Sequence, residues 1–394
     1  MGVEMNMVRG ASVTERINRK RREIYEKEIS ACSIFGAMSR DGKRFRGDGV
    51  IKAMANMHAR GNGLGGGFAI YGLYPAYEDY YAFHIMLEKG DAKREVDDFL
   101  GTNFDVVCDE EIPTSEVVEV VDPPSVWRYF AVPPKKGEKK NLSDDDYVVR
   151  KVMHINTRIG GAYVFSSGKN MGVFKGVGYP EDIAEYFLLE DYKGYIWTAH
   201  GRFPTNTQGW WGGAHPFCIL DWTVAHNGEI SSYGTNRRYL EMYGYHCTLH
   251  TDTEIMAYAV DLLARKQKLP IDVVAKIFAP PIWEAIEREG ERKRKILTAL
   301  RRTYASLLLN GPFTVIIAHH GEMIGLTDRI RLRPLTAAVR GETTYLSSEE
   351  AAIRLVSEKL DQVWTPNGGE PVVVRIDDKT KGRGGEGYEV LSFA

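Results

Sequence analysis

Short apolar runs with strand character lie at both ends of the sequence, and the middle has the periodicity of helices. The strand-like runs are 32–36 and 68–74 near the beginning, and 313–318, 323–326, 343–347 and 372–376 towards the end. Between them, apolar residues recur at helical spacing in 252–266, two more helices are predicted to follow, and the charged side of 283–309 is interpreted as a solvated helix face. This order of elements predicts a mixed α+β protein.

The composition is that of an ordinary globular protein. The chain has 394 residues, more than the roughly 250 to 300 at which one core stops growing, so two domains or one domain with an inserted lobe are expected. A net charge of -2 gives no reason to expect a nucleic-acid partner, and no segment calls for a membrane. The four cysteines are far apart and form no CxxC pair, so no metal site is predicted and a reduced, cytoplasmic setting is expected.

The first 31 residues differ from those that follow. Ser12 and Glu15 have capping-box spacing, and a charged run over 16–28 predicts one solvated helix. The segment ends where Ala31 meets Cys32, the first residue of an apolar strand-like run. We therefore expect 1–31 to be a removable prosegment and 32–394 to form the functional domain.

Two further segments are predicted to be structural. Prolines punctuate an acidic stretch over about 74–148, which is interpreted as an inserted lobe with a strand-like run at 116–121 and no recognisable chemistry. The glycines of 61–67 satisfy GxGxxG, but they follow a helix and precede a strand, the reverse of a dinucleotide fingerprint. A tight helix-to-strand turn with close backbone approach is the better interpretation of these glycines.

Polar motifs are densest over 200–254, and each of them has an ordinary structural explanation when taken alone. His226-Asn227-Gly228 follows an apolar run and could be a plain turn, since Asn-Gly is a common hairpin dipeptide. Arg202 could be a structural arginine, and Asp252 could be a first-turn acid that the helix dipole favours. The motifs become informative through their order.

That order resembles the glutaminase domain of the class II, or N-terminal nucleophile, glutamine amidotransferases over most of 32–350. The matching blocks are Cys32-Ser33-Ile34-Phe35-Gly36, Arg60-Gly61, Arg202-Phe203-Pro204-Thr205-Asn206-Thr207, Ala214-His215-Pro216, His226-Asn227-Gly228, Thr251-Asp252-Thr253-Glu254, Leu332-Arg333-Pro334-Leu335 and Ser347-Ser348-Glu349. The RFPTNT and HNGEI sequences are most similar to those of the glutamate synthase branch. The resemblance implies a four-layer αββα sandwich of two antiparallel sheets, with the inserted lobe as an addition.

The resemblance also implies the catalytic residues. Cys32 would be the nucleophile, and its own α-amine, freed by loss of the prosegment, would be the general base. Asn227 and the N–H of Gly228 would form the oxyanion hole. The implied glutamine-binding residues are Arg202 for the α-carboxylate and Asp252 for the α-ammonium, together with Arg60, Thr205, Asn206 and His226.

The resemblance implies that the ammonia acceptor lies elsewhere. No cofactor is expected in this chain; FMN and an iron–sulfur cluster would belong to a partner synthase subunit, with 2-oxoglutarate as acceptor. Ser33 replaces the usual glycine, and 62–67 lacks the family's Asp-Ser pair, which are departures in turn geometry. Two alternatives stay open: an amidohydrolase of another amide, and a non-catalytic subunit.

Overall fold

The computed structural model describes residues 31–88, 90–135, 139, 141–203, 209–249 and 251–377, and the backbone of 388–390. The predicted helix within 1–31 and the predicted site residues Thr205 and Asn206 lie outside the described residues.

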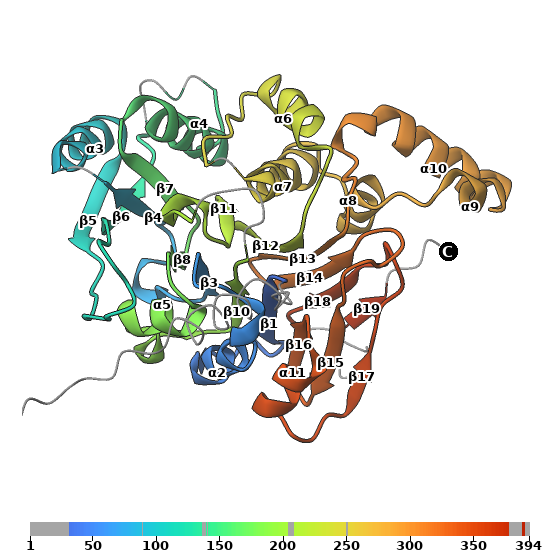
Figure 1. Ribbon diagram of the computed structural model, residues 1–394. Helices are drawn as coiled ribbons and strands as arrows, with labels where there is room; N and C mark the ends of the chain where they lie inside the picture. Colours follow the sequence, from blue (N-terminus) through green and yellow to red (C-terminus); the bar gives the residue numbers. More distant parts are fainter. Residues whose placement is uncertain are drawn as a thin grey trace, which may run out of the picture. The chain divides into compact units, whose positions relative to one another are not determined.

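Two antiparallel sheets form the centre of the domain (Figure 1). The strands of the first, in spatial order, are β17 (Gln362–Trp364), β15 (Thr336–Arg340), β16 (Thr343–Ser347), β1 (Ser33–Ser39), β10 (Ile196–Gly201), β3 (Gly66–Tyr71) and β8 (Met171–Gly176). Those of the second are β11 (Phe217–Ile219), β12 (Trp222–Gly228), β13 (Phe313–His319), β14 (Glu322–Thr327), β18 (Val372–Arg375) and β19 (Tyr388–Val390).

The two sheets pack face to face. A Cβ added to Gly36 on β1 would lie 2.8 Å from the sulfur of Met323 on β14, so the sheets approach closely at this glycine. Helices cover the outer faces: α2 (Asp48–Asn56), α5 (Pro180–Tyr186) and α11 (Glu350–Val356) pack on the first sheet, and α7 (Asp252–Val260) packs on the second. The predicted four-layer α+β sandwich is therefore confirmed, and its layers can be followed in Figure 1.

A third antiparallel sheet lies beside the sandwich. Its order is β5 (Asp105–Glu111), β6 (Ser125–Val132), β4 (Tyr81–Leu87) and β7 (Ala162–Ser166), and it is accompanied by α3 (Gly90–Asn103) and α4 (Asp144–Arg158). Most of this sheet comes from the acidic, proline-containing stretch. The predicted strand over 116–121 is wrong, because these residues form irregular chain and a turn in which Val118 and Val121 are exposed and gain no burial from pairing.

The helical middle of the chain differs from the prediction at one point. The helix predicted over 252–266 is present as α7, which continues into a π-helix (Asp261–Lys266). Where two more helices were predicted, three follow: α8 (Ile271–Phe278), α9 (Trp283–Glu287) and α10 (Glu291–Thr303), with a 3₁₀ turn (Ala305–Leu307) after them. The break between α9 and α10 falls at Gly290, which has the extended ψ of a residue that precedes a new helix. The remaining helix, α6 (Tyr233–Glu241), precedes α7.

The glycine-rich segment 61–67 forms the predicted tight turn before a strand. A 3₁₀ turn (His58–Arg60) ends before it, and β3 begins at Gly66. A Cβ at Gly67 would lie 2.4 Å from the carbonyl oxygen of His215, so only glycine allows this backbone approach. The turn therefore presses the start of β3 against the segment that carries His215.

Candidate active site

The thiol of Cys32 lies at the N-terminal end of β1, beside the end of β10. The register that pairs Ser33 with Gly201 brings Cys32 next to the segment that follows β10. There the backbone N–H of Phe203 donates to the Cys32 sulfur over 3.3 Å. Burial raises the pKa of the Cys32 thiol, while the Phe203 N–H and the charges of Arg202 and Arg333 act in the opposite direction. In the intact chain the thiol is therefore held in its protonated form near neutral pH.

The guanidinium of Arg60 fixes the main chain at Cys32. Its Nε and Nη2 donate to the carbonyl oxygen of Cys32 at 3.3 and 3.2 Å, and its Nη1 lies 2.6 Å from a carboxylate oxygen of Glu349. Glu349 lies two residues after β16, the strand that pairs with the other edge of β1. The structure thus places Arg60 on the backbone of Cys32, where it joins Cys32 to the C-terminal part of the domain.

Asn227 and Gly228 close β12 on the opposite sheet. The Asn227 side chain is fully buried, and its Nδ2 donates to the Oγ of Ser348 over 3.3 Å. That hydroxyl also accepts the N–H of Ile34 at 3.1 Å, so it joins Asn227 to the start of β1. The Oδ1 of Asn227 has no hydrogen-bond partner among the described residues. Rotating the amide by 180° would let Ser348 donate to Oδ1 and would leave the NH₂ group available to a ligand.

The backbone conformation at position 228 requires glycine. Its φ is +144°, and a Cβ there would lie 2.0 Å from the carbonyl oxygen of Pro312. Any other residue would therefore displace the end of β12.

Asp252 begins α7 within a set of polar contacts. Its Oδ2 accepts the N–H of Ile230 at 3.0 Å, and its Oδ1 lies 3.6 Å from Nδ1 of His226. The same His226 nitrogen lies 3.0 Å from the hydroxyl of Thr253. Burial acts to raise the pKa of Asp252, but His226 and the Ile230 N–H outweigh it, so the pKa is lowered and the carboxylate stays ionised.

Arg202 is almost fully buried between glycines. Its N–H donates to the carbonyl oxygen of Gly65 at 2.8 Å, and a Cβ on Gly213 would lie 3.1 Å from its Nη1. Burial lowers the pKa of Arg202, and the charges of Cys32 and Asp252 oppose this shift. The guanidinium, the thiol and the carboxylate are therefore close enough to influence one another, although they come from three distant segments.

Three buried histidines form a column behind these groups. The rings of His200 and His215 stack with centroids 3.9 Å apart, and His226 continues the stack at 6.4 Å from His215. Burial lowers the pKa of His200 to about 3 and holds that of His215 well below its usual value, so both are neutral. His226 is thus placed by packing as well as by Asp252.

Four contacts at the site were not predicted from the sequence. They are the Phe203 N–H on the sulfur, the Ser348 hydroxyl on Asn227, the Glu349 carboxylate on Arg60 and the charge of Arg333 near Cys32. The Ser347-Ser348-Glu349 and Leu332-Arg333-Pro334 strings were recognisable motifs, but only the pairing of β16 with β1 shows what Ser348 and Glu349 contact.

The described part of the chain contains no group of three side chains arranged to hold a metal ion. None of its helices is both long and apolar enough to cross a membrane.

Comparison with known proteins gives a consistent result. The sequence model for glutamine amidotransferases class-II matches residues 97–381. An uncharacterized protein of Archaeoglobus fulgidus is 64% identical over 92% of this chain and 97% of its own length. An amidophosphoribosyltransferase of Methanocaldococcus jannaschii is 23% identical over 55% of this chain, which spans 41% of that enzyme.

Among solved structures, the glutamine phosphoribosylpyrophosphate amidotransferase from B. subtilis matches 92% of this chain, with a TM-score of 0.46 and 16% identity. The chain spans about half of that protein, 49% of its length.

Proposed function

The chain belongs to the class II glutamine amidotransferases, and from this premise we propose that it hydrolyses the side-chain amide of L-glutamine to glutamate and ammonia through a thioester on Cys32. One observation carries the proposal: the backbone N–H of Phe203, the neighbour of Arg202, donates to the sulfur of Cys32, and the charges of both Arg202 and Asp252 act on that thiol. An arginine and an aspartate near a nucleophile suit the α-carboxylate and α-ammonium of an amino acid. This pair also argues against an amide substrate that lacks these two groups.

The chemistry proceeds in two steps. The Cys32 sulfur attacks the amide carbon, a C–S bond forms, and the negative charge on the amide oxygen is accepted by Asn227 and the N–H of Gly228. The C–N bond then breaks, and ammonia leaves with the proton taken from the thiol. Water hydrolyses the thioester, which returns the thiol and releases glutamate.

A base must take the thiol proton in the first step. The histidine column does not supply it. Among the described residues no hydrogen bond joins its rings to the sulfur of Cys32, and the lowered pKa of His200 and His215 makes these two rings weak proton acceptors. The α-amine of Cys32 has an ordinary pKa of about 7.7 to 8.0, which suits a general base, once the peptide bond to Ala31 is cleaved. We therefore propose that removal of 1–31 activates the enzyme.

The ammonia acceptor is proposed to be a separate synthase subunit of the glutamate synthase type. The RFPTNT and HNGEI segments support this choice. Such a partner would carry FMN and an iron–sulfur cluster and would aminate 2-oxoglutarate. It would receive ammonia through a sheltered path, because free ammonia is otherwise lost to solvent.

The test compares two forms of the chain: full-length protein, and protein that begins at Cys32. Glutamate release from glutamine is expected only from the second form, and Cys32→Ala in that form is expected to abolish it. Equal activity of the full-length form would contradict the proposal that removal of 1–31 activates the enzyme. Hydrolysis of another amide in place of glutamine would favour the amidohydrolase, and inactivity of both forms would favour the non-catalytic subunit. Co-purification of a flavin and iron–sulfur protein from the native source tests the acceptor.

A further inference from the structure

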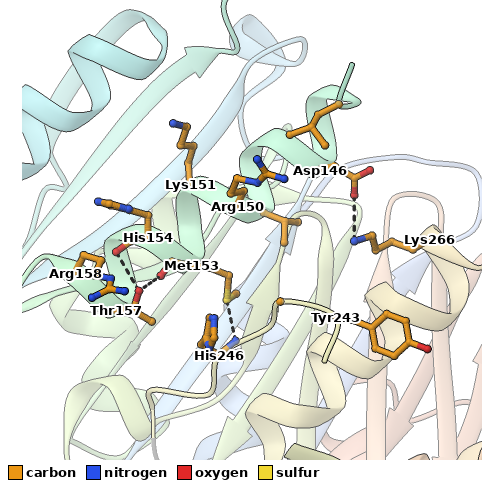
Figure 2. Close-up of a pocket in the computed structure, with 13 residues that line it drawn as sticks. Asp146, Arg150, Lys151, Met153, His154, Thr157, Arg158, Tyr243, His246 and Lys266 are labelled. Carbon is orange, nitrogen blue, oxygen red and sulfur yellow. Dashed lines mark hydrogen bonds and ion pairs between the residues drawn. The ribbon is translucent and has the colours of Figure 1, made fainter. Parts of the chain in front are cut away.

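A pocket of about 470 Å³ lies beside α4, between this helix, the segment that joins α6 to α7, and the π-helix that follows α7 (Figure 2). Its volume falls in the range of small-molecule sites, roughly 300 to 1,000 Å³. It shares no lining residue with the candidate active site. Glutamine hydrolysis as proposed above therefore gives this pocket no role.

One wall of the pocket carries two arginines on α4, with a histidine between them whose pKa is lowered by burial and by the charges of Lys151 and Arg158. Arg150, His154 and Arg158 are four residues apart, so they lie along one face of the helix. Arg150 and Arg158 are exposed, and neither forms an ion pair with any described residue. Figure 2 shows both guanidinium groups on the same helix, with His154 between them.

The opposite wall is basic as well. His246 comes from the segment before α7, and Lys266 comes from the end of the π-helix. Among the described residues that line the pocket, Asp146 is the only carboxylate, and it is already engaged by Arg265 at 3.0 Å and by Lys266 at 3.7 Å. The described residues around Arg150 and Arg158 therefore leave their positive charge uncompensated.

Several other charged residues of the described chain that are four apart form ion pairs. They are Lys93 with Asp97, Arg237 with Glu241, Glu289 with Lys293, Glu291 with Lys295, and Glu350 with Arg354. Arg150 and Arg158 have no such partner among the described residues, and they differ from an ordinary solvated face because they line a concave surface.

The floor and rim of the pocket are held in place before any ligand arrives. The ring of His154 stacks on Phe99 with centroids 4.6 Å apart and an interplanar angle of 3°. The N–H of His246 contacts the sulfur of Met153 at 3.2 Å, and the hydroxyl of Thr157 donates to the Met153 carbonyl oxygen. A ligand would therefore meet basic groups whose backbone is already ordered.

We propose that this pocket binds a small phosphorylated molecule. The two unpaired guanidinium groups would hold the phosphate in their planar, bidentate geometry, and Lys266 would add charge from the opposite wall. Leu142, Val149 and Tyr243, which also line the pocket, would contact the organic part of the ligand. A concave site of this size is typical of sites that bind small molecules, whereas protein partners usually dock on flatter surfaces.

The test uses inorganic pyrophosphate as the probe and isothermal titration calorimetry on the full-length chain. Pyrophosphate should bind the wild type, and the double variant R150A/R158A should weaken binding by at least about tenfold, since each guanidinium contributes charge-assisted hydrogen bonds. The matched control is R292A/R294A, which removes the same charge from exposed positions on α10 that form no ion pair with any described residue. It should bind as the wild type does.

Because both pairs of arginines are exposed, both variants should fold, and equal melting temperatures would establish this. The proposal is overturned if the wild type does not bind pyrophosphate at millimolar concentration, or if the two variants bind it equally. Citrate binding as tight as pyrophosphate binding would refute the phosphate specificity. If the pocket binds an acidic polypeptide but does not bind pyrophosphate, it is a protein-docking face instead. None of these readouts depends on glutamine hydrolysis.

Discussion

The backbone N–H of Phe203 donates to the sulfur of Cys32, which places a hydrogen-bond donor from the segment after β10 directly on this thiol. This contact stabilises a thiolate, but it does not overcome burial, which raises the pKa of the thiol. As the proposed nucleophile, Cys32 would therefore need a base that takes its proton.

The first prediction concerns the reactivity of Cys32 in the full-length chain. Because the pKa of its thiol is raised, the thiolate fraction should be small at neutral pH and should increase as the pH rises beyond about 9. Labelling with iodoacetamide, followed by mass spectrometry of the Cys32 peptide, should show this increase. Arg202→Ala should slow labelling further, since Arg202 lowers the pKa of the thiol. Rapid labelling at neutral pH would contradict the prediction.

The second prediction concerns glutamine binding. Asp252→Asn keeps an oxygen that can accept the N–H of Ile230 but removes the negative charge. The loss of a charge-assisted contact, roughly 1.5 to 3 kcal/mol, should weaken glutamine binding about tenfold to hundredfold. Calorimetry in a Cys32→Ser background measures this without turnover. Asp272→Asn, at another first-turn acid on α8, is the control and should leave the affinity unchanged.

The third prediction concerns the oxyanion hole. Asn227→Ala should lower kcat by about 10² to 10³ with little change in KM, because the lost donor acts mainly in the transition state. Ser348→Ala should lower kcat less, because it removes the hydroxyl that orients Asn227 and leaves the amide itself in place. Steady-state kinetics of the chain that begins at Cys32 measure both effects. An unchanged kcat in Asn227→Ala would remove Asn227 from the mechanism.

The fourth prediction concerns the buried amine of Lys175. Burial lowers its pKa from 10.5 to about 7. Between these values the unfolded chain holds one more proton than the folded chain, so the free energy of unfolding rises with pH through this group. Lys175→Met removes that contribution. The gain in the free energy of unfolding of the variant over the wild type should therefore be largest below about pH 7.

The advantage of Lys175→Met should shrink as the pH rises towards 10.5. Glu254 adds to this trend: its pKa is raised to about 7 by burial, and loss of the nearby ammonium would raise it further. Urea denaturation at several pH values measures the difference, with the exposed Lys193→Met as control. A stability difference that does not vary with pH would show that Lys175 keeps an ordinary pKa.

The sequence predicted the elements of this fold better than the contacts between them. Apolar periodicity reports how one segment is buried, and it identified the strand that follows Cys32 and the helix that begins at Asp252. It could not reveal the bond between Asn227 and Ser348, which are 121 residues apart, because that contact depends on the order of strands in two sheets. The break at Gly290 was missed because charged residues continue on both sides of it.

The place of β1 inside its sheet has a consequence for biosynthesis. This strand, the earliest in the described chain, pairs with β10 on one side and with β16 on the other, and Arg60 joins Cys32 to Glu349. Contacts between such distant parts of a sequence form slowly, because long loops must close first. During translation, the partners of β1 at Thr343–Ser347 leave the ribosome long after the strand itself. The surroundings of Cys32 are therefore complete only after Glu349 has been synthesised, and a chain truncated before this residue lacks both the β1–β16 pairing and the partner of Arg60.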